Sequence, residues 1–255
     1  MKRIVALGFF DGVHLGHGAL IERTKQLAAE SGCIPSVLTF DSYPLSQVRG
    51  SAGQILTSVE DRCRLIGQIY GVKDVIVMPF DRQTMNTPAE DFIHRLRDEF
   101  GAAGFVCGYD FRFGKGGAGN AALLKEHCSA NGLYFSSVDE VDICGERVSS
   151  TIVRRLLSEG EVEEAEKFLG HPHIMTGTAT AERVVGSTVV RIVPDSGVML
   201  PLVGVYDTRI IAADGTSCGA VTSVGENGTV SRLFGLDIAV IPNRLTIQFL
   251  RFIEV

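Results

Sequence analysis

The chain has 255 residues, a formal net charge of −6, 45% hydrophobic residues and 21% charged residues, which is a composition typical of a globular protein. A net negative chain without a lysine or arginine run lacks the charge on which most nucleic-acid binders depend. No apolar run approaches the ~18 residues of a membrane span, and the first apolar stretch meets Asp11 and His14 too early for a signal peptide. The six cysteines show no C-x-x-C pair, which favours reduced thiols over disulfides or a zinc site. We therefore expect a cytoplasmic protein without nucleic-acid or membrane partners.

Short apolar strands alternate with helical patterns over the first two-thirds of the chain. Strands are expected at residues 4–7, 35–40, 74–78, 105–107 and 134–138, and helices at 17–31, 58–70, 88–100 and 119–131. The run Thr87-Pro88-Ala89-Glu90 has the pattern of a capping box, with proline at the first helical position. This alternation predicts an α/β fold with a parallel sheet covered on both faces. The ligand site of such a sheet lies beyond the carboxyl ends of its strands.

The pattern changes after about residue 170. Gly170 is placed to end a helix, with Pro172 just beyond it. The residues that follow are β-branched runs separated by turns, and Asp214-Gly215 and Asn227-Gly228 are hairpin signals. This part of the chain therefore predicts a small antiparallel β-barrel.

The ten residues from Gly8 to His17, here called the histidine loop, follow the first strand and open a helix. The glycines allow backbone to approach a ligand closely, and the N–H groups and dipole of a helix N-terminus suit phosphate. His14 and His17 flank Gly16, so both imidazoles can face a triphosphate and stabilise charge on its α-phosphate and on leaving pyrophosphate. The alternative is a glycine turn with two surface histidines.

The histidine loop resembles the G-x-F-D-G-x-H-x-G-H signature of bacterial FAD synthetases, the bifunctional riboflavin kinase/FMN adenylyltransferases. Two further segments match in the same order. Gly108–Lys115 is similar to the family's G-x-D-F-R-F-G-K, and Ser149–Arg154 to its S-S-T-x-I-R. The resemblance implies a Rossmann-like nucleotidylyltransferase domain at residues 1–172, followed by a barrel at 173–255 that corresponds to a riboflavin kinase.

The second motif supplies groups for a flat ligand at the end of the fourth strand. Asp110 can accept from ribose hydroxyls or a ring N–H, Phe111 or Phe113 can stack on a ring, and Arg112 can hold a phosphate or brace the loop. The alternative is a strand-end turn with packed aromatic residues.

The third motif precedes a helix, so by itself it predicts an N-cap. The same hydroxyl and N–H donors can hold ATP phosphates, with Arg154 adding charge-assisted hydrogen bonds. Arg155 points elsewhere on the helix and is not included.

The resemblance implies FMN adenylyltransferase activity, ATP + FMN → FAD + pyrophosphate, with Mg²⁺ accompanying ATP and no metal held by the protein alone. Catalytic roles fall on His14, His17 and Arg154. ATP binding falls on Gly8, Phe9, Phe10, Asp11, Gly16, Ser149, Ser150 and Thr151, and flavin or nucleotide binding on Gly108, Asp110, Phe111 and Arg112. The alternatives are a non-catalytic flavin- or nucleotide-binding protein and a nucleotidylyltransferase for another phosphorylated acceptor.

Some positions depart from the family pattern in the first domain. Tyr43 replaces the histidine of its F-E-P-H-P segment, and Gly117 and Asn120 stand where an arginine and an aspartate are usual. These departures bear on affinity or substrate choice.

The barrel departs further. Residues 186–192 lack the Pro-Thr and Asn of the kinase motif G-F-P-T-x-N, residues 229–232 contain no glutamate, and the sequence stops at Val255 without the family's final helix. We therefore expect that riboflavin kinase activity is lost. The alternative is a kinase site rebuilt from Asp195, Asp237 or Glu226.

Overall fold

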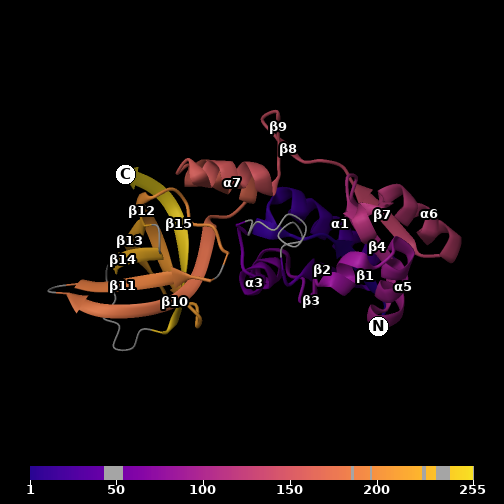
Figure 1. Cartoon of the computed structure of the whole chain (residues 1–255), viewed down its shortest axis with the longest axis horizontal. Helices are drawn as coiled ribbons and strands as arrows, with labels where there is room; N and C mark the ends of the chain where they lie inside the picture. The colour runs from indigo at the N-terminus through magenta and orange to yellow at the C-terminus, as the bar shows by residue number, and fades with distance from the viewer. Residues whose placement is uncertain (43–53, 185–186, 196, 226–227, 234–241, 255) are drawn as a thin grey trace. The chain divides into compact units, whose positions relative to one another are not determined.

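The structure is a computed structural model, and it describes residues 1–42, 54–184, 187–195, 197–225, 228–233 and 242–254. Its contacts divide the chain into two compact units (Figure 1). The first unit comprises Met1–Gly53 and Cys63–Val148, and the second comprises Gln54–Arg62 and Ser149–Val255. The predicted division at residues 172 and 173 follows the family resemblance rather than contacts, and it stays a prediction.

The first unit is built on the predicted parallel sheet. Its strands are β1 (Arg3–Leu7), β2 (Ile34–Phe40), β3 (Asp74–Met78), β4 (Ala102–Gly108) and β7 (Tyr134–Val138), in the order β3-β2-β1-β4-β7. Its helices are α1 (Leu15–Ser31), α4 (Arg82–Asn86), α5 (Ala89–Phe100) and α6 (Ala121–Asn131), and α3 (Val59–Tyr70) begins in the second unit and ends in the first. Two short hairpins, β5–β6 (Arg112–Phe113, Gly119–Asn120) and β8–β9 (Asp142–Ile143, Glu146–Arg147), complete it.

The central strand of the sheet is buried. Ile4–Leu7 of β1 are all at most 1% exposed, as expected where helices cover both faces. On one face Val5 and Leu7 pack with Phe92, Ile93 and Leu96 of α5, which confirms the apolar stripe seen in the sequence.

The predicted capping box is wrong. Pro88 precedes the helix with extended backbone (φ −56°, ψ 154°), and no side chain caps α5. The Thr87 hydroxyl instead donates to the Gln83 carbonyl at 2.9 Å, and its backbone N–H bonds to the Thr84 carbonyl. Thr87 is therefore used to end α4, a short helix that the sequence pattern did not indicate.

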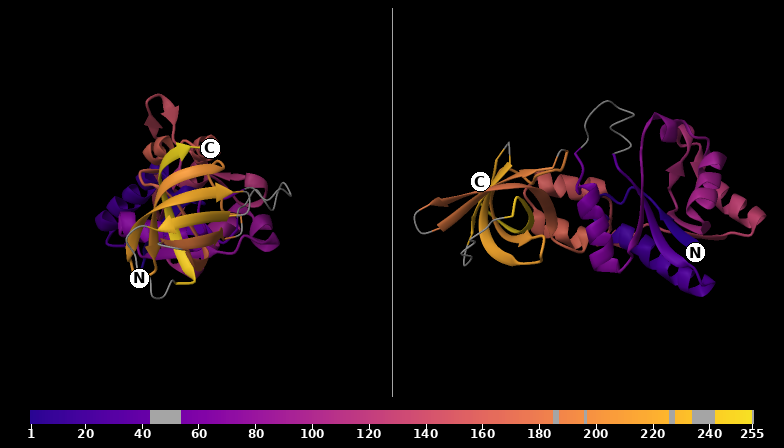
Figure 2. Two further views of the ribbon diagram at one scale, coloured as in Figure 1. Left: turned by 90° about the vertical axis from the view of Figure 1, so that its left-hand side faces the viewer. Right: turned by 90° about the horizontal axis from the view of Figure 1, so that it is seen from below.

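The second unit contains the predicted barrel, closed in the order β10-β11-β14-β13-β12-β15 (Figure 2). Its elements are α7 (Ser150–Ser158), α8 (Val162–Leu169), β10 (His173–Val184), β11 (Ser187–Pro194), β12 (Gly204–Ala212), β13 (Ser217–Gly225), β14 (Gly228–Leu233) and β15 (Arg244–Glu254). Gly170 ends α8 in the left-handed conformation (φ 79°), as predicted. The Asp214-Gly215 turn joins β12 to β13, whereas Asn227 lies outside the described residues.

Candidate active site

The strand order places two of the three motifs at one edge of the sheet. Connections from β1 lead to β2 and β3 on one side, while β4 and β7 lie on the other, so the order reverses at β1. β1 and β4 are parallel neighbours, with Val5 opposite Phe105 and Ala6 opposite Val106. The histidine loop follows β1, and the second motif, Gly108–Lys115, called here the Gly108 loop, follows β4. The two loops therefore leave the sheet side by side, at the switch point where open α/β sheets bind ligands.

The backbone of the histidine loop turns through three left-handed residues. Phe10, Gly12 and Val13 have φ values of 58°, 77° and 45°, and such a conformation is costly for a bulky or β-branched side chain. Phe10 and Val13 are both fully buried, and the Val13 N–H donates to the Phe10 carbonyl at 3.1 Å. Packing thus holds a turn that the chain would not adopt by itself, and this turn delivers His14 to the start of α1.

The two histidines form one compact pair. Their rings stack with centroids 3.6 Å apart and an interplanar angle of 14°. His14 is the N-cap of α1, and its Nδ1 accepts from the His17 backbone N–H at 3.3 Å. Neutral His14 therefore carries its proton on Nε2.

Small and buried neighbours fix this pair in place. A Cβ on Gly16 would lie 3.2 Å from two atoms of the His14 ring, so glycine leaves room for the imidazole. The Phe10 ring lies 5.0 Å from that of His17, and it occupies the space that a Cβ on Gly8 would meet at 3.0 Å. Phe10 thus shapes the loop, and Asp11 is only 2% exposed.

Polar side chains of the Gly108 loop form a cluster with the β8–β9 hairpin, which the sequence pattern did not predict. The Asp110 carboxylate accepts from the Arg147 guanidinium of β9 at 2.5 Å. The same guanidinium lies over the Tyr109 ring, and the Tyr109 hydroxyl donates to Glu140 at 2.9 Å. The side chains of Asp110 and Arg147 are 53% and 49% exposed, so a ligand can exchange this pair at little cost. Arg147 lies two residues before the S-S-T-x-I-R motif, a position that could have drawn notice.

The aromatic residues of this loop divide into core and surface. Phe113 is 7% exposed and packs 5.6 Å from the Phe92 ring. Phe111 stacks on Phe113 at 5.6 Å and 18° while remaining half-buried, so Phe111 is the ring able to meet a flat ligand. Arg112 is exposed on β5.

Two departures from the family pattern have local structural explanations. Asn120 caps α6 by accepting from the Leu123 N–H at 2.9 Å, a position that asparagine and aspartate fill equally well. Gly117 has a φ of 68°, which favours glycine over other residues. Tyr43 lies outside the described residues.

The third motif belongs to the second unit. Ser149 caps α7, its hydroxyl accepting from the Ile152 N–H at 3.4 Å, which confirms the N-cap. Thr151 is exposed in the first turn, and the Arg154 Nε donates to the Gln54 carbonyl at 2.9 Å. Arg155 forms a separate ion pair with Glu159 at 3.2 Å. The roles of Ser149, Ser150, Thr151 and Arg154 toward ATP stay predictions.

The acids proposed for a rebuilt kinase site do not form one in the described part of the barrel. Asp195 accepts two hydrogen bonds from Arg244, at 2.9 and 3.1 Å, while Asp237 and Glu226 lie outside the described residues. Among the described residues, no three His, Cys, Asp or Glu side chains gather as a metal site. No helix in the described part of the chain is long and apolar enough to cross a membrane.

Comparison with known proteins identifies relatives of this chain. The family model described as FAD synthetase matches residues 1–152. The chain is 33% identical to a bifunctional riboflavin kinase/FMN adenylyltransferase of Listeria monocytogenes, over 94% of this chain and 77% of that protein. It is 27% identical to a FAD synthetase of the same organism, over 80% of each chain. A crystal structure titled as a macrolide-efflux protein from Streptococcus pneumoniae superposes with a TM-score of 0.86, covering 99% of this chain and 86% of that one. At 23% identity, that likeness shows the fold alone.

Proposed function

Because the chain belongs to the FAD synthetase family of nucleotidyltransferases, we propose that it is an FMN adenylyltransferase, which converts ATP and FMN to FAD and pyrophosphate. The observation that carries the proposal is the stacked pair of His14 and His17 at the N-terminus of α1. Two imidazole donors and a helix N-terminus are the groups needed where charge builds on the phosphates of ATP.

The reaction needs no protein nucleophile, because the FMN phosphate is already an anion. A phosphate oxygen of FMN attacks the α-phosphorus of ATP, and the bond from that phosphorus to the departing pyrophosphate breaks. Catalysis then consists of positioning the two substrates and stabilising charge. His14 and His17 hold the α- and β-phosphates, and the rigid backbone of the histidine loop keeps their rings in place.

The remaining motif residues receive their roles from the family resemblance and from their local chemistry. Ser149, Ser150 and Thr151 offer hydroxyl and N–H donors to the ATP phosphates, and Arg154 adds a charge. Half-buried Phe111 stacks on the flavin or adenine ring, Asp110 accepts from the flavin or a ribose, and Arg112 lies exposed beside them. Gly108 admits close approach of the ligand.

We propose that Mg²⁺ binds together with ATP. Such an ion keeps several water ligands and is held largely by substrate phosphates, so it requires few protein oxygens. When bound, it neutralises charge on the phosphates.

We also propose that the barrel does not phosphorylate riboflavin and that the enzyme is cytoplasmic. The kinase motif G-F-P-T-x-N has its proline and threonine where this chain has Thr188 and Val189, and Val190 follows them. The Asp195 carboxylate accepts hydrogen bonds from Arg244. The six cysteines form no disulfide, which suits a reducing compartment.

One experiment tests both catalytic proposals, adenylyl transfer to FMN and the absence of riboflavin phosphorylation. Purified protein is incubated with Mg²⁺ and ATP, once with FMN and once with riboflavin, and flavin products are separated by chromatography. FAD from FMN and no product from riboflavin is the expected result. FMN or FAD from riboflavin would show that the barrel is an active kinase. Tight binding of ATP and FMN without pyrophosphate release would favour a non-catalytic binder, and no binding of FMN would favour another phosphorylated acceptor.

A further inference from the structure

A short segment that is distant in sequence from the barrel is built into the second unit. This segment, Gln54–Arg62, is called here the inserted segment. Its backbone pairs with a barrel loop, because the Ile55 N–H donates to the Gly197 carbonyl and the Met199 N–H donates to the Ile55 carbonyl, both at 2.8 Å. The inserted segment is thus joined by its backbone to the loop that follows β11.

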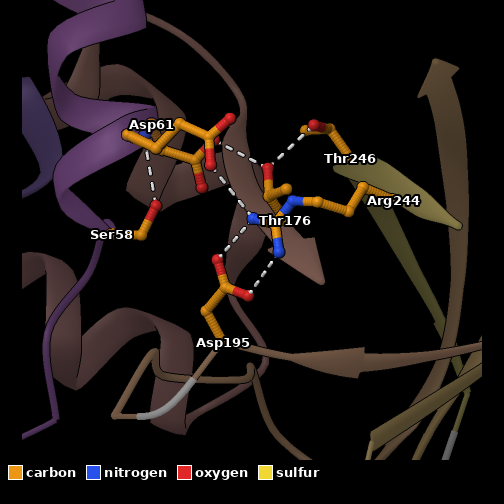
Figure 3. A network of polar contacts seen from close by, with 7 residues as sticks. Ser58, Asp61, Thr176, Asp195, Arg244 and Thr246 are labelled. Atoms are coloured by element: carbon orange, nitrogen blue, oxygen red, sulfur yellow. Dashed lines mark hydrogen bonds and ion pairs between the residues drawn. The ribbon is translucent and has the colours of Figure 1, made fainter. Parts of the chain in front are cut away.

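Side chains of two barrel strands hold the far end of the inserted segment (Figure 3). Arg244 of β15 binds Asp195 through both terminal nitrogens, at 3.1 and 2.9 Å, and reaches Glu60 at 3.1 Å. The Thr176 hydroxyl of β10 donates to Asp61 at 2.6 Å. These contacts from Arg244 and Thr176 are called here the barrel clamp.

The Asp61 half of the clamp is buried. Asp61 is 1% exposed, and Thr176 and Thr246 are 6% and 4% exposed. Since Thr176 gives its proton to Asp61, its oxygen is open to accept from the Thr246 hydroxyl at 2.8 Å. A buried carboxylate with a hydroxyl donor from another element ties the two elements together, because losing the donor strands a desolvated charge.

The inserted segment is stiff between the clamp and its other end. Leu56 and Thr57 are at most 1% exposed, and the Thr57 carbonyl accepts from Arg62 at 3.3 Å. Ser58 caps the start of α3 by accepting from the Asp61 N–H at 3.1 Å. These contacts hold the backbone between Gln54 and the clamp as one packed, hydrogen-bonded segment.

Gln54, at the other end of the inserted segment from the clamp, contacts Arg154, a residue of the proposed reaction. The Gln54 carbonyl accepts from the Arg154 Nε at 2.9 Å. We propose that Arg244 and Thr176 are positioning residues, which hold the inserted segment so that Gln54 orients Arg154 toward the phosphates of ATP. The inference rests on the proposed function for the ATP role of Arg154. It gives the barrel a task in adenylyl transfer that does not depend on kinase activity.

The test compares Arg244→Ala with a matched control on the same strand. Arg251→Ala removes a similar ion pair, with Asp207 at 2.5 Å, that does not involve the inserted segment. Four quantities are measured for each full-length variant: the Kd for MgATP by calorimetry, KM for ATP, KM for FMN, and amide hydrogen exchange of residues 54–62. Thr176→Val provides a second clamp variant, and Arg244→Lys tests rescue by a charge that cannot form the same fork.

We expect both clamp variants to raise exchange in residues 54–62 and to weaken MgATP binding by about tenfold, the size of effect expected when a positioned phosphate ligand is lost. KM for FMN stays unchanged, Arg251→Ala behaves as wild type, and Arg244→Lys recovers part of the loss. Unchanged exchange in Arg244→Ala would overturn the clamp. Raised exchange with unchanged MgATP affinity would overturn the positioning role.

Failure of the proposed function gives a different result. In that case the wild-type protein forms no FAD from ATP and FMN, yet Arg154→Ala still changes the Kd for MgATP, and the clamp variants still decide the positioning role. If Arg154→Ala leaves that Kd unchanged, the inference is refuted.

Discussion

Lowering the pH should destabilise the barrel through a single buried histidine. His173 begins β10, is 2% exposed, and packs with its ring centroid 5.7 Å from that of Phe249. Burial lowers the pKa of His173 from 6.5 to about 4, and its Nε2 lies 3.2 Å from the Met199 carbonyl oxygen. The unfolded chain therefore binds a proton between pH 6.5 and about 4 that the folded barrel does not.

The sign and size of the effect follow from that difference in pKa. Stability is fully present above pH 6.5, where the histidine is neutral in both states, and it is lost as pH falls toward 4. The loss amounts to about 2 kcal/mol at pH 5 and about 3 kcal/mol once the pH is below both pKa values.

The assay is urea unfolding of the second unit, followed at several pH values between 7 and 4.5, for wild type and His173→Phe. The phenylalanine keeps a ring against Phe249 but cannot titrate, so contributions from all other groups cancel in the difference. We expect the wild-type free energy of unfolding to fall more steeply with pH than that of the variant. Parallel curves over this range would refute the assignment of a neutral, buried His173.

Three further predictions concern the first unit. His17→Ala should lower the turnover number for FAD formation by at least ~10², the scale of a lost transition-state donor; an unchanged rate would remove this residue from the active site. Gly16→Ala should raise KM for ATP by several-fold with little change in thermal midpoint, because its Cβ would lie 3.2 Å from the His14 ring; wild-type kinetics would contradict that crowding. Burial raises the pKa of the Cys107 thiol to about 12, so iodoacetamide at pH 8 should label exposed Cys144 in the folded protein and spare Cys107. Equal labelling, read by mass spectrometry, would count against a buried fourth strand.

The pattern of apolar runs was enough to predict the sheet strands and the barrel class. The inner strands β1 and β4 are buried along almost all of their length, so each is an apolar run that is visible in the sequence. The outer strands β3 and β7 are only partly buried. Local turn chemistry was equally visible at Gly170 and at Asp214-Gly215, because those conformations depend on residues that are adjacent in the chain.

The capping box shows where local pattern misled. Thr87 and Pro88 satisfied the signature of a helix start, but Thr87 is used by the helix before it. The competing partner is supplied by α4, an element that the sequence pattern did not predict.

The sequence by itself determined the chemistry of this protein: the two histidines, the glycines around them and the order of the three motifs are covalent facts, and they sufficed to identify a family and an expected reaction. Only the tertiary structure decided which groups meet over long separations. The stacking of His14 on His17 needs the buried left-handed turn at Phe10, the pairing of Asp110 with Arg147 spans 37 residues, and that of Arg244 with Glu60 spans 184. Such contacts depend on strand order and barrel closure, which bring distant residues together, and no local pattern records them.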